Sequence, residues 1–228
     1  ESLPPDALEE LNVCMNQISR IVTITENLKE FSRIPKIKLI MASINNVIDG
    51  ILVMSATQLK IEEIETAVHC QSDLPEIFMD REKIEQVILN LISNAMASME
   101  GKEKKILRIT TEKEVLPGDR DQLKIMIADT GTGIKSEVMP KIFDPFYTTK
   151  EPGKGTGLGL SVCFMIIEGI GGQIKATSKE SEGTAMIVAL GVIQIATSLL
   201  LIVLVLLHKG KGSGLSDLFG GGMSSSYG

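Results

Sequence analysis

The feature that most constrains this chain is a run of 23 uncharged residues, Ala185 to Leu207, near its C-terminus. About 20 apolar residues in a helix are enough to cross a bilayer. Residues 1–184 instead have the usual mixture of charged and apolar side chains. The sequence therefore predicts a globular part followed by an apolar segment suited to a membrane.

The composition argues against several classes of function. Lys and Arg total 23 against 29 Asp and Glu, a formal net charge of −6, which disfavours nucleic acid as a partner. The three cysteines, Cys14, Cys70 and Cys163, are too scattered for a disulfide framework or a metal cluster, and they suit a reducing cytosol. The chain starts at Glu1 without Met and stops inside a Gly/Ser run, so we expect both ends to be cut.

Residues 7–33 are predicted to form a helix that ends before Pro35. Its apolar residues recur in steps of three and four: Leu8, Leu11, Met15, Ile18 and Val22. One helix cannot bury such a stripe alone. We therefore expect residues 1–35 to be part of a helical bundle that joins two copies of the chain as a homodimer.

Residues 36–190 mix helical and strand patterns without strict alternation. Helices are predicted over 43–60 with Ser43 as N-cap, from the N-cap Asp80 to about Met99, and over 158–170. Strands are predicted over 61–70, 105–112, 122–128, 173–178 and 184–190. This order predicts an α+β fold, a two-layer sandwich of a mixed β-sheet with helices on one face.

Asn90 and Asn94 lie about 40° apart on one face of the helix that follows Asp80, away from its apolar stripe. Two stacked amides can meet a hydrated Mg²⁺, which takes few protein ligands. Two asparagines on a solvated helix face remain the plainer interpretation of this pair.

Asp129 directly follows an apolar strand, and Gly131 and Gly133 come two and four residues later. A carboxylate at a strand end can accept a hydrogen bond from an exocyclic amine such as that of adenine, and glycines let the backbone approach a flat base. An ordinary turn, or a turn like that of a calcium-binding loop, is an alternative interpretation of the same residues.

Two further segments can bind phosphate. Phe143-Asp144-Pro145-Phe146 is followed by two threonines and Lys150, which suits a lid that carries charge toward phosphates. Residues 153–160, GKGTGLGL, open a helix whose free N–H groups can bind an anion, although a flexible hinge is the alternative. The segment matches neither the P-loop nor the dinucleotide fingerprint.

Taken together, N-x-x-x-N, D-x-G-x-G, F-x-P-F and G-x-G-x-G resemble, in order and spacing, the N, G1, F and G2 boxes of sensor histidine kinases. The resemblance covers residues 7 to 190. It implies an ATP-binding catalytic domain in the cytoplasm that works with Mg²⁺ and serves a response regulator in two-component signalling. Relatives such as DNA gyrase usually place an acidic residue at the position of Asn90 to activate water, so the amide fits a kinase.

The resemblance also implies a role for each matching position. Asn94 binds Mg²⁺, Asn90 lies near the phosphates, Asp129 reads the adenine amine, and Phe146 anchors the lid. The other residues that it places in the ATP site are Gly131, Gly133, Ile134, Thr149, Lys150, Gly155, Thr156, Gly157, Leu158, Gly159, Leu160 and Thr184.

One departure from the family pattern limits the expected activity. The family's phosphoacceptor histidine sits on a helix before the one at 7–33, and this chain has only His69 and His208. Neither matches the acceptor motif. We expect the chain to bind ATP and to phosphorylate an acceptor helix supplied in trans, but not itself.

Residues 191–228 resemble the first membrane helix and Gly-rich loop of SecG, a protein-export subunit. Lys209 and Lys211 place the tail in the cytoplasm by the positive-inside rule, and a single span then puts residues 1–190 outside. We therefore expect a junction of two gene fragments near 187–192. A translocon subunit, attached to the inner membrane through residues 191–207, is the alternative function. An ATPase or chaperone of the same fold is a third.

Overall fold

The computed structural model of the chain describes residues 37–116, 120–151 and 155–191, together with isolated residues between 7 and 25. The helix predicted over 7–33 lies mostly outside the described residues, although those described between Ala7 and Thr25 are helical. The SecG-like tail lies outside them after Gly191. Within the described ranges, no helix combines the length and apolar character that crossing a bilayer requires.

A five-stranded mixed sheet forms one layer of the fold, in the order β2-β4-β5-β7-β6. Its strands are β2 (Glu65–Cys70), β4 (Ile106–Leu116), β5 (Arg120–Asp129), β6 (Gln173–Lys179) and β7 (Gly183–Gly191). Strands β2 and β4 run parallel, and every other neighbouring pair is antiparallel. The mixed sheet predicted from the sequence is therefore confirmed.

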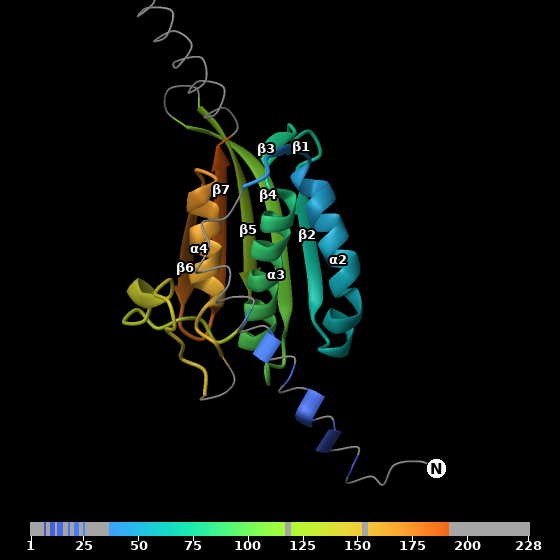
Figure 1. Cartoon of the computed structure of the whole chain (residues 1–228), viewed down its shortest axis with the longest axis vertical. Coiled ribbons are helices and arrows are strands. Elements are labelled where there is room, and N and C mark those ends of the chain that lie inside the picture. Colours follow the sequence, from blue (N-terminus) through green and yellow to red (C-terminus); the bar gives the residue numbers. More distant parts are fainter. Residues whose placement is uncertain are drawn as a thin grey trace, which may run out of the picture. The chain divides into compact units, whose positions relative to one another are not determined.

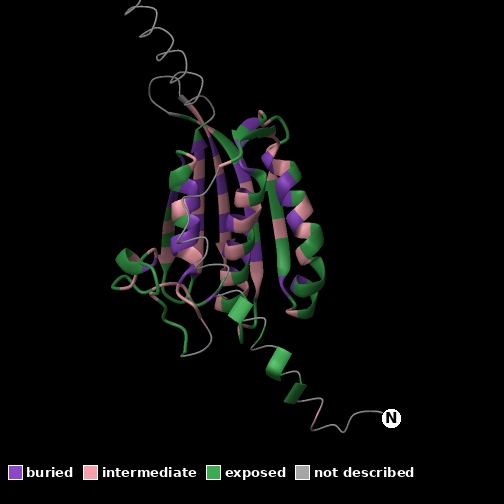
Figure 2. Ribbon diagram, viewed as in Figure 1, coloured by how far each residue is buried: buried purple, intermediate pink, exposed green. Residues whose placement is uncertain are grey.

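Three helices form the second layer: α2 (Ile44–Ile61), α3 (Arg81–Ser98) and α4 (Gly159–Gly169). They lie on one face of the sheet, with α3 in contact with both α2 and α4 (Figure 1). The sides of the helices and strands that face each other are buried (Figure 2). Fully buried side chains from both layers form this core, among them Ile48, Ile84, Ile88, Leu107, Ile109 and Leu123.

The helix starts follow from local chemistry. The Ser43 hydroxyl accepts from the Asn46 amide, and Asp80 accepts from the Lys83 amide, so both predicted N-caps are confirmed. The strand predicted over 61–70 starts too early, because α2 continues through Ile61 and a turn follows it. Two short strands were not predicted: β1 (Ile40–Ala42) pairs with β3 (Ile77–Met79) as a separate two-stranded sheet.

Asp80 is expected to contribute more to stability than an ordinary helix cap. It is buried, and its two carboxylate oxygens accept from the Lys83 amide at 3.2 Å and from the Lys38 amide at 2.8 Å. Asp80→Ala should lower the free energy of unfolding by about 2 kcal/mol, measured by urea denaturation. Asp73→Ala, in the exposed turn after β2, is the matched control. Equal losses in the two variants would contradict this account.

Candidate nucleotide-binding site

A cavity of about 330 Å³ is lined by residues of α3, of the segment between β5 and α4, and of the start of α4. This cavity brings together ten of the residues predicted from the sequence: Asn90, Asn94, Ile134, Thr149, Lys150, Gly155, Thr156, Gly157, Gly159 and Leu160. Its other lining residues were not predicted: Ser93, Val138, Ile142, Tyr147 and Thr148. Segments far apart in the sequence therefore meet at one concave site.

The two asparagine amides meet the start of α4. A side chain added at Gly159 would lie 3.9 Å from Asn94 Nδ2 and 4.0 Å from Asn90 Oδ1, so the missing side chain leaves room beside both amides. Asn90 Nδ2 is buried, and the Asn90 side chain interacts with the buried thiol of Cys163 on α4. This wall of the cavity fits a ligand with several oxygen atoms, such as a phosphate chain with its hydrated metal ion.

Asp129, Gly131, Gly133, Phe146, Leu158 and Thr184 were also predicted, and they do not line this cavity. Strand register places Asp129 opposite Thr184, and Thr184 opposite Ser178, in one row across the helix-covered face of the sheet. Asp129 Oδ1 accepts from the Gly131 amide at 2.8 Å and from the Ser98 hydroxyl at 2.9 Å. The row gives the site a second polar region in which a carboxylate is held by named donors.

Burial raises the pKa of the Asp129 carboxyl, and hydrogen bonds from the Gly131 amide, the Ser98 hydroxyl and the Thr184 amide partly lower it. Lys150 keeps an exposed surface, yet the protein atoms around its ammonium lower its pKa, and the nearby Glu100 carboxylate partly opposes this shift. Desolvation therefore disfavours the charged form of both groups.

Glycines are required where the loop after β5 packs tightly. A side chain at Gly131 would collide with Ser98, and one at Gly133 would collide with the Lys179 carbonyl. Gly133 also has a positive φ of 69°, which an L-residue adopts only with strain. The two glycines predicted to shape the base pocket thus have a packing role in this structure.

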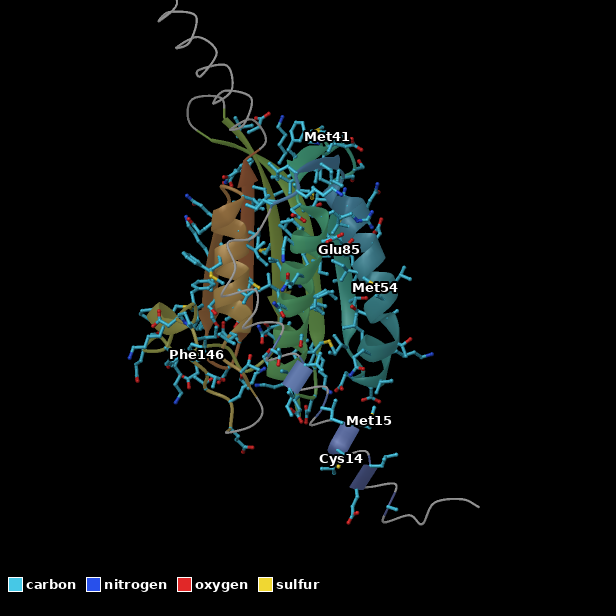
Figure 3. All side chains as sticks on the ribbon, viewed as in Figure 1. Cys14, Met15, Met41, Met54, Glu85 and Phe146 are labelled. Carbon is cyan, nitrogen blue, oxygen red and sulfur yellow. The ribbon has the colours of Figure 1, made fainter. Side chains whose placement is uncertain are left out.

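The segment between β5 and α4 holds two residues with positive φ that face each other. Phe146, on this segment in Figure 3, has φ 66°, and Gly157 also has φ 66°. A side chain at Gly157 would collide with the backbone of Phe146. Phe146 therefore packs the segment through its main chain, while its side chain is largely exposed.

Two further hydroxyl residues, which contact Asp129 and Thr184, were also missed by the sequence analysis. Ser178 Oγ accepts from the Ile134 amide at 2.8 Å, donates to the Gly183 carbonyl at 2.7 Å, and lies 2.9 Å from Thr184 Oγ1. Asn90 and Asn94 are four residues apart, and Ser98 comes four residues after Asn94. Extending this spacing by one step would have placed Ser98 on the same helix face. No comparable pattern marks Ser178, whose place depends on strand register.

Comparison with known proteins agrees with this geometry. The family model for histidine kinase-, DNA gyrase B- and HSP90-like ATPases matches residues 79–193. The model for the preprotein translocase SecG subunit matches residues 187–228. The two matches overlap at residues 187–193, of which residues 187–191 belong to strand β7.

Individual relatives are sensor kinases. The sensor kinase CckA of Brucella abortus (strain 2308) is 33% identical over an alignment of 193 residues, and the match covers 79% of this chain and 20% of CckA. This chain therefore spans about a fifth of that relative's length. The solved catalytic domain of histidine kinase ThkA is 27% identical with a TM-score of 0.58, and the match covers 68% of this chain and 96% of that domain.

A further structure is that of ThkA in complex with the response regulator protein TrrA. It is 25% identical to this chain with a TM-score of 0.67, and the match covers 84% of this chain and 53% of that one. The predicted two-layer fold is thus that of histidine-kinase catalytic domains.

The raised pKa of Asp129 predicts how pH acts on stability. Between the ordinary carboxyl pKa and the raised one, the folded state binds more protons than the unfolded state, so stability falls as pH rises through that window. Asp129→Asn removes this loss. Its free energy of unfolding relative to the wild type should therefore increase as pH is raised from about 4 to 7, measured by urea denaturation. Asp144→Asn, on the exposed loop, is the control, and parallel curves for Asp129→Asn and wild type would refute the account.

Proposed function

Because this chain belongs to the histidine kinase-, DNA gyrase B- and HSP90-like ATPase family, we propose that it binds ATP with Mg²⁺ and transfers the γ-phosphoryl group to a histidine on an acceptor helix supplied by another polypeptide or segment. Among its relatives it corresponds to the ATP-binding catalytic region of sensor histidine kinases. The observation that carries the proposal is the cavity itself, where two amides of α3 face the Gly-rich start of α4.

Each region of the site suits one part of the nucleotide. Asp129, held by the Gly131 amide and the Ser98 hydroxyl, can accept a hydrogen bond from the adenine amine. Asn90 and Asn94 offer amides to the phosphates, and Asn94 is the residue that would hold Mg²⁺. That ion neutralises charge on the phosphate oxygens when it is bound.

The chain's own residues act by position and charge. The free N–H groups at the start of α4, beginning at Gly159, favour the negative charge of a phosphate. Lys150 lines the cavity, and a phosphate beside it would favour its charged form. Phosphoryl transfer depends mainly on such positioning and charge compensation. The amide of Asn90, in place of a carboxylate, gives the chain no general base there to activate water for hydrolysis.

The acceptor and the partners follow from the same assignment. His69 is exposed on β2 and does not line the cavity, and His208 lies outside the described residues. We infer that the acceptor histidine is on a helix beyond these residues, that residues 1–35 contribute to a homodimeric bundle, and that the phosphoryl group passes to a response regulator. The ThkA complex with its response regulator supports the last step. Such a domain works in the cytoplasm, where ATP is available.

A second function is favoured by the SecG model match over residues 187–228. It would make the tail a membrane subunit of the protein-export translocon. Residues 187–191 of that match pair with β5 as part of β7, and residues 187–189 pair with β6 as well. The catalytic function therefore takes precedence for residues up to Gly191.

The kinase proposal predicts Mg²⁺-dependent ATP binding by the whole chain, measured by isothermal titration calorimetry with and without the metal. Asn94→Ala should abolish most of the Mg²⁺ enhancement, and Asp129→Asn should weaken ATP binding about tenfold or more. Asn46→Ala, on the exposed face of α2, is the matched control and should bind like the wild type. The absence of ATP binding by the folded wild-type chain would overturn the proposal.

The contact between Gly157 and Phe146 predicts a separable effect on the lid. Gly157→Ala and Gly171→Ala both place an L-residue at positive φ, so each should lose about 1–2 kcal/mol of stability in urea denaturation. A side chain at Gly171 meets open space, whereas one at Gly157 collides with the backbone of Phe146 and displaces the segment between β5 and α4, which is the predicted lid. Only Gly157→Ala should therefore lower ATP affinity, by about tenfold. The same affinity in both variants would show that this contact does not shape the site.

A further inference from the structure

One face of α3 carries three polar residues spaced four apart: Asn90, Asn94 and Ser98. Each step of four residues advances about 6 Å along a helix and turns it by about 40°, so the three side chains form a row. The first two line the cavity. The third reaches the Asp129 carboxylate, so the row extends from the phosphate region of the site to its base region.

The Ser98 hydroxyl has one proton and two neighbouring acceptors. Its Oγ lies 2.7 Å from the Ala95 carbonyl oxygen and 2.9 Å from Asp129 Oδ1. The Ala95 carbonyl already accepts from the Met99 amide at 3.2 Å. A hydrogen bond to a charged acceptor is the stronger one, so the proton serves Asp129 whenever that carboxylate is ionised.

The backbone of Ser98 is tied to the loop after β5 independently of its hydroxyl. Its carbonyl accepts from the Thr132 amide at 3.0 Å, and Gly131 packs so closely that a side chain there would collide with Ser98. Replacing Ser98 with alanine removes the hydroxyl and keeps the carbonyl contact. The role of the hydroxyl can therefore be tested apart from the packing of the loop.

We propose that Ser98 is a positioning residue that makes the site selective for a purine with an exocyclic amine. Its hydroxyl and the Gly131 amide both donate to Oδ1 of Asp129, and the Thr184 amide also donates to this carboxylate. These donors fix the carboxylate, and Oδ2 keeps a lone pair that can accept from the amine. This inference rests on the proposed function, because it assigns Asp129 to the base.

The test compares ATP with purine riboside 5′-triphosphate, which lacks the 6-amino group, using calorimetry with the whole chain. Ser98→Ala should weaken ATP binding about tenfold and leave the amine-free analogue within about twofold, since only the amine contacts the carboxylate. Ser98→Cys, with a weak S–H donor, should lie between wild type and alanine, and it provides the same comparison if the alanine variant does not fold. Ser55→Ala on α2 is the matched control.

The outcomes separate this inference from the proposed function. Wild-type preference for ATP that disappears in Ser98→Ala supports both. Wild-type preference that survives unchanged in Ser98→Ala, or an equal loss for both nucleotides, overturns the role of Ser98 and leaves the proposed function intact. Binding of neither nucleotide by the folded wild-type chain overturns both.

Discussion

The site depends on how helix α3 is held against the sheet. Its buried stripe, formed by Ile84, Val87, Ile88, Leu91, Ile92 and Ala95, fixes the rotation of the helix about its own axis. Burial of this stripe is the main source of free energy that orders the helix, since helices in proteins are stabilised mostly by the tertiary packing of an amphipathic face. Once the rotation is fixed, so is the direction in which the polar face with Asn90, Asn94 and Ser98 points. The position of the polar row is therefore determined by the burial of the apolar stripe. Binding chemistry here is a consequence of core packing.

Desolvation sets the electrostatic character of the site. Burial disfavours the charged forms of both Asp129, at the end of β5, and Lys150, in the segment between β5 and α4. Neutral donors compensate the carboxylate: the Gly131 amide, the Ser98 hydroxyl and the Thr184 amide. For Lys150, the nearby Glu100 carboxylate partly offsets the lowering of the pKa by burial. A ligand that is anionic at one end and donates a hydrogen bond at the other satisfies both groups, which is the pattern of an adenine nucleotide.

The parts of the structure that the sequence predicted are those set by local patterns. The stripe of α3, the caps Ser43 and Asp80, and the apolar strands are each encoded within a few residues. The pairing of β1 with β3 places Ile40 opposite Met79, 39 residues further along the chain, and strands of three residues are too short to show a detectable period. Ser178 enters the site through the register of β6 on β7. Phe146 has a positive φ where its backbone lies close to Gly157, eleven residues later, and no local sequence pattern indicates that contact.

Strand β7 contains the first residues of the apolar run, up to Gly191. Met186, Val188 and Leu190 are buried, and the strand is paired on both sides, so residues 183–191 cannot leave the sheet without exposing the core. The uncharged residues that remain, 192–207, number 16 and would span about 24 Å as a helix, against about 30 Å of hydrocarbon. A full membrane span and an intact sheet therefore compete for the same residues. Because the side chains of this internal strand are buried, keeping residues 183–191 in the sheet is favoured over moving them into a membrane helix.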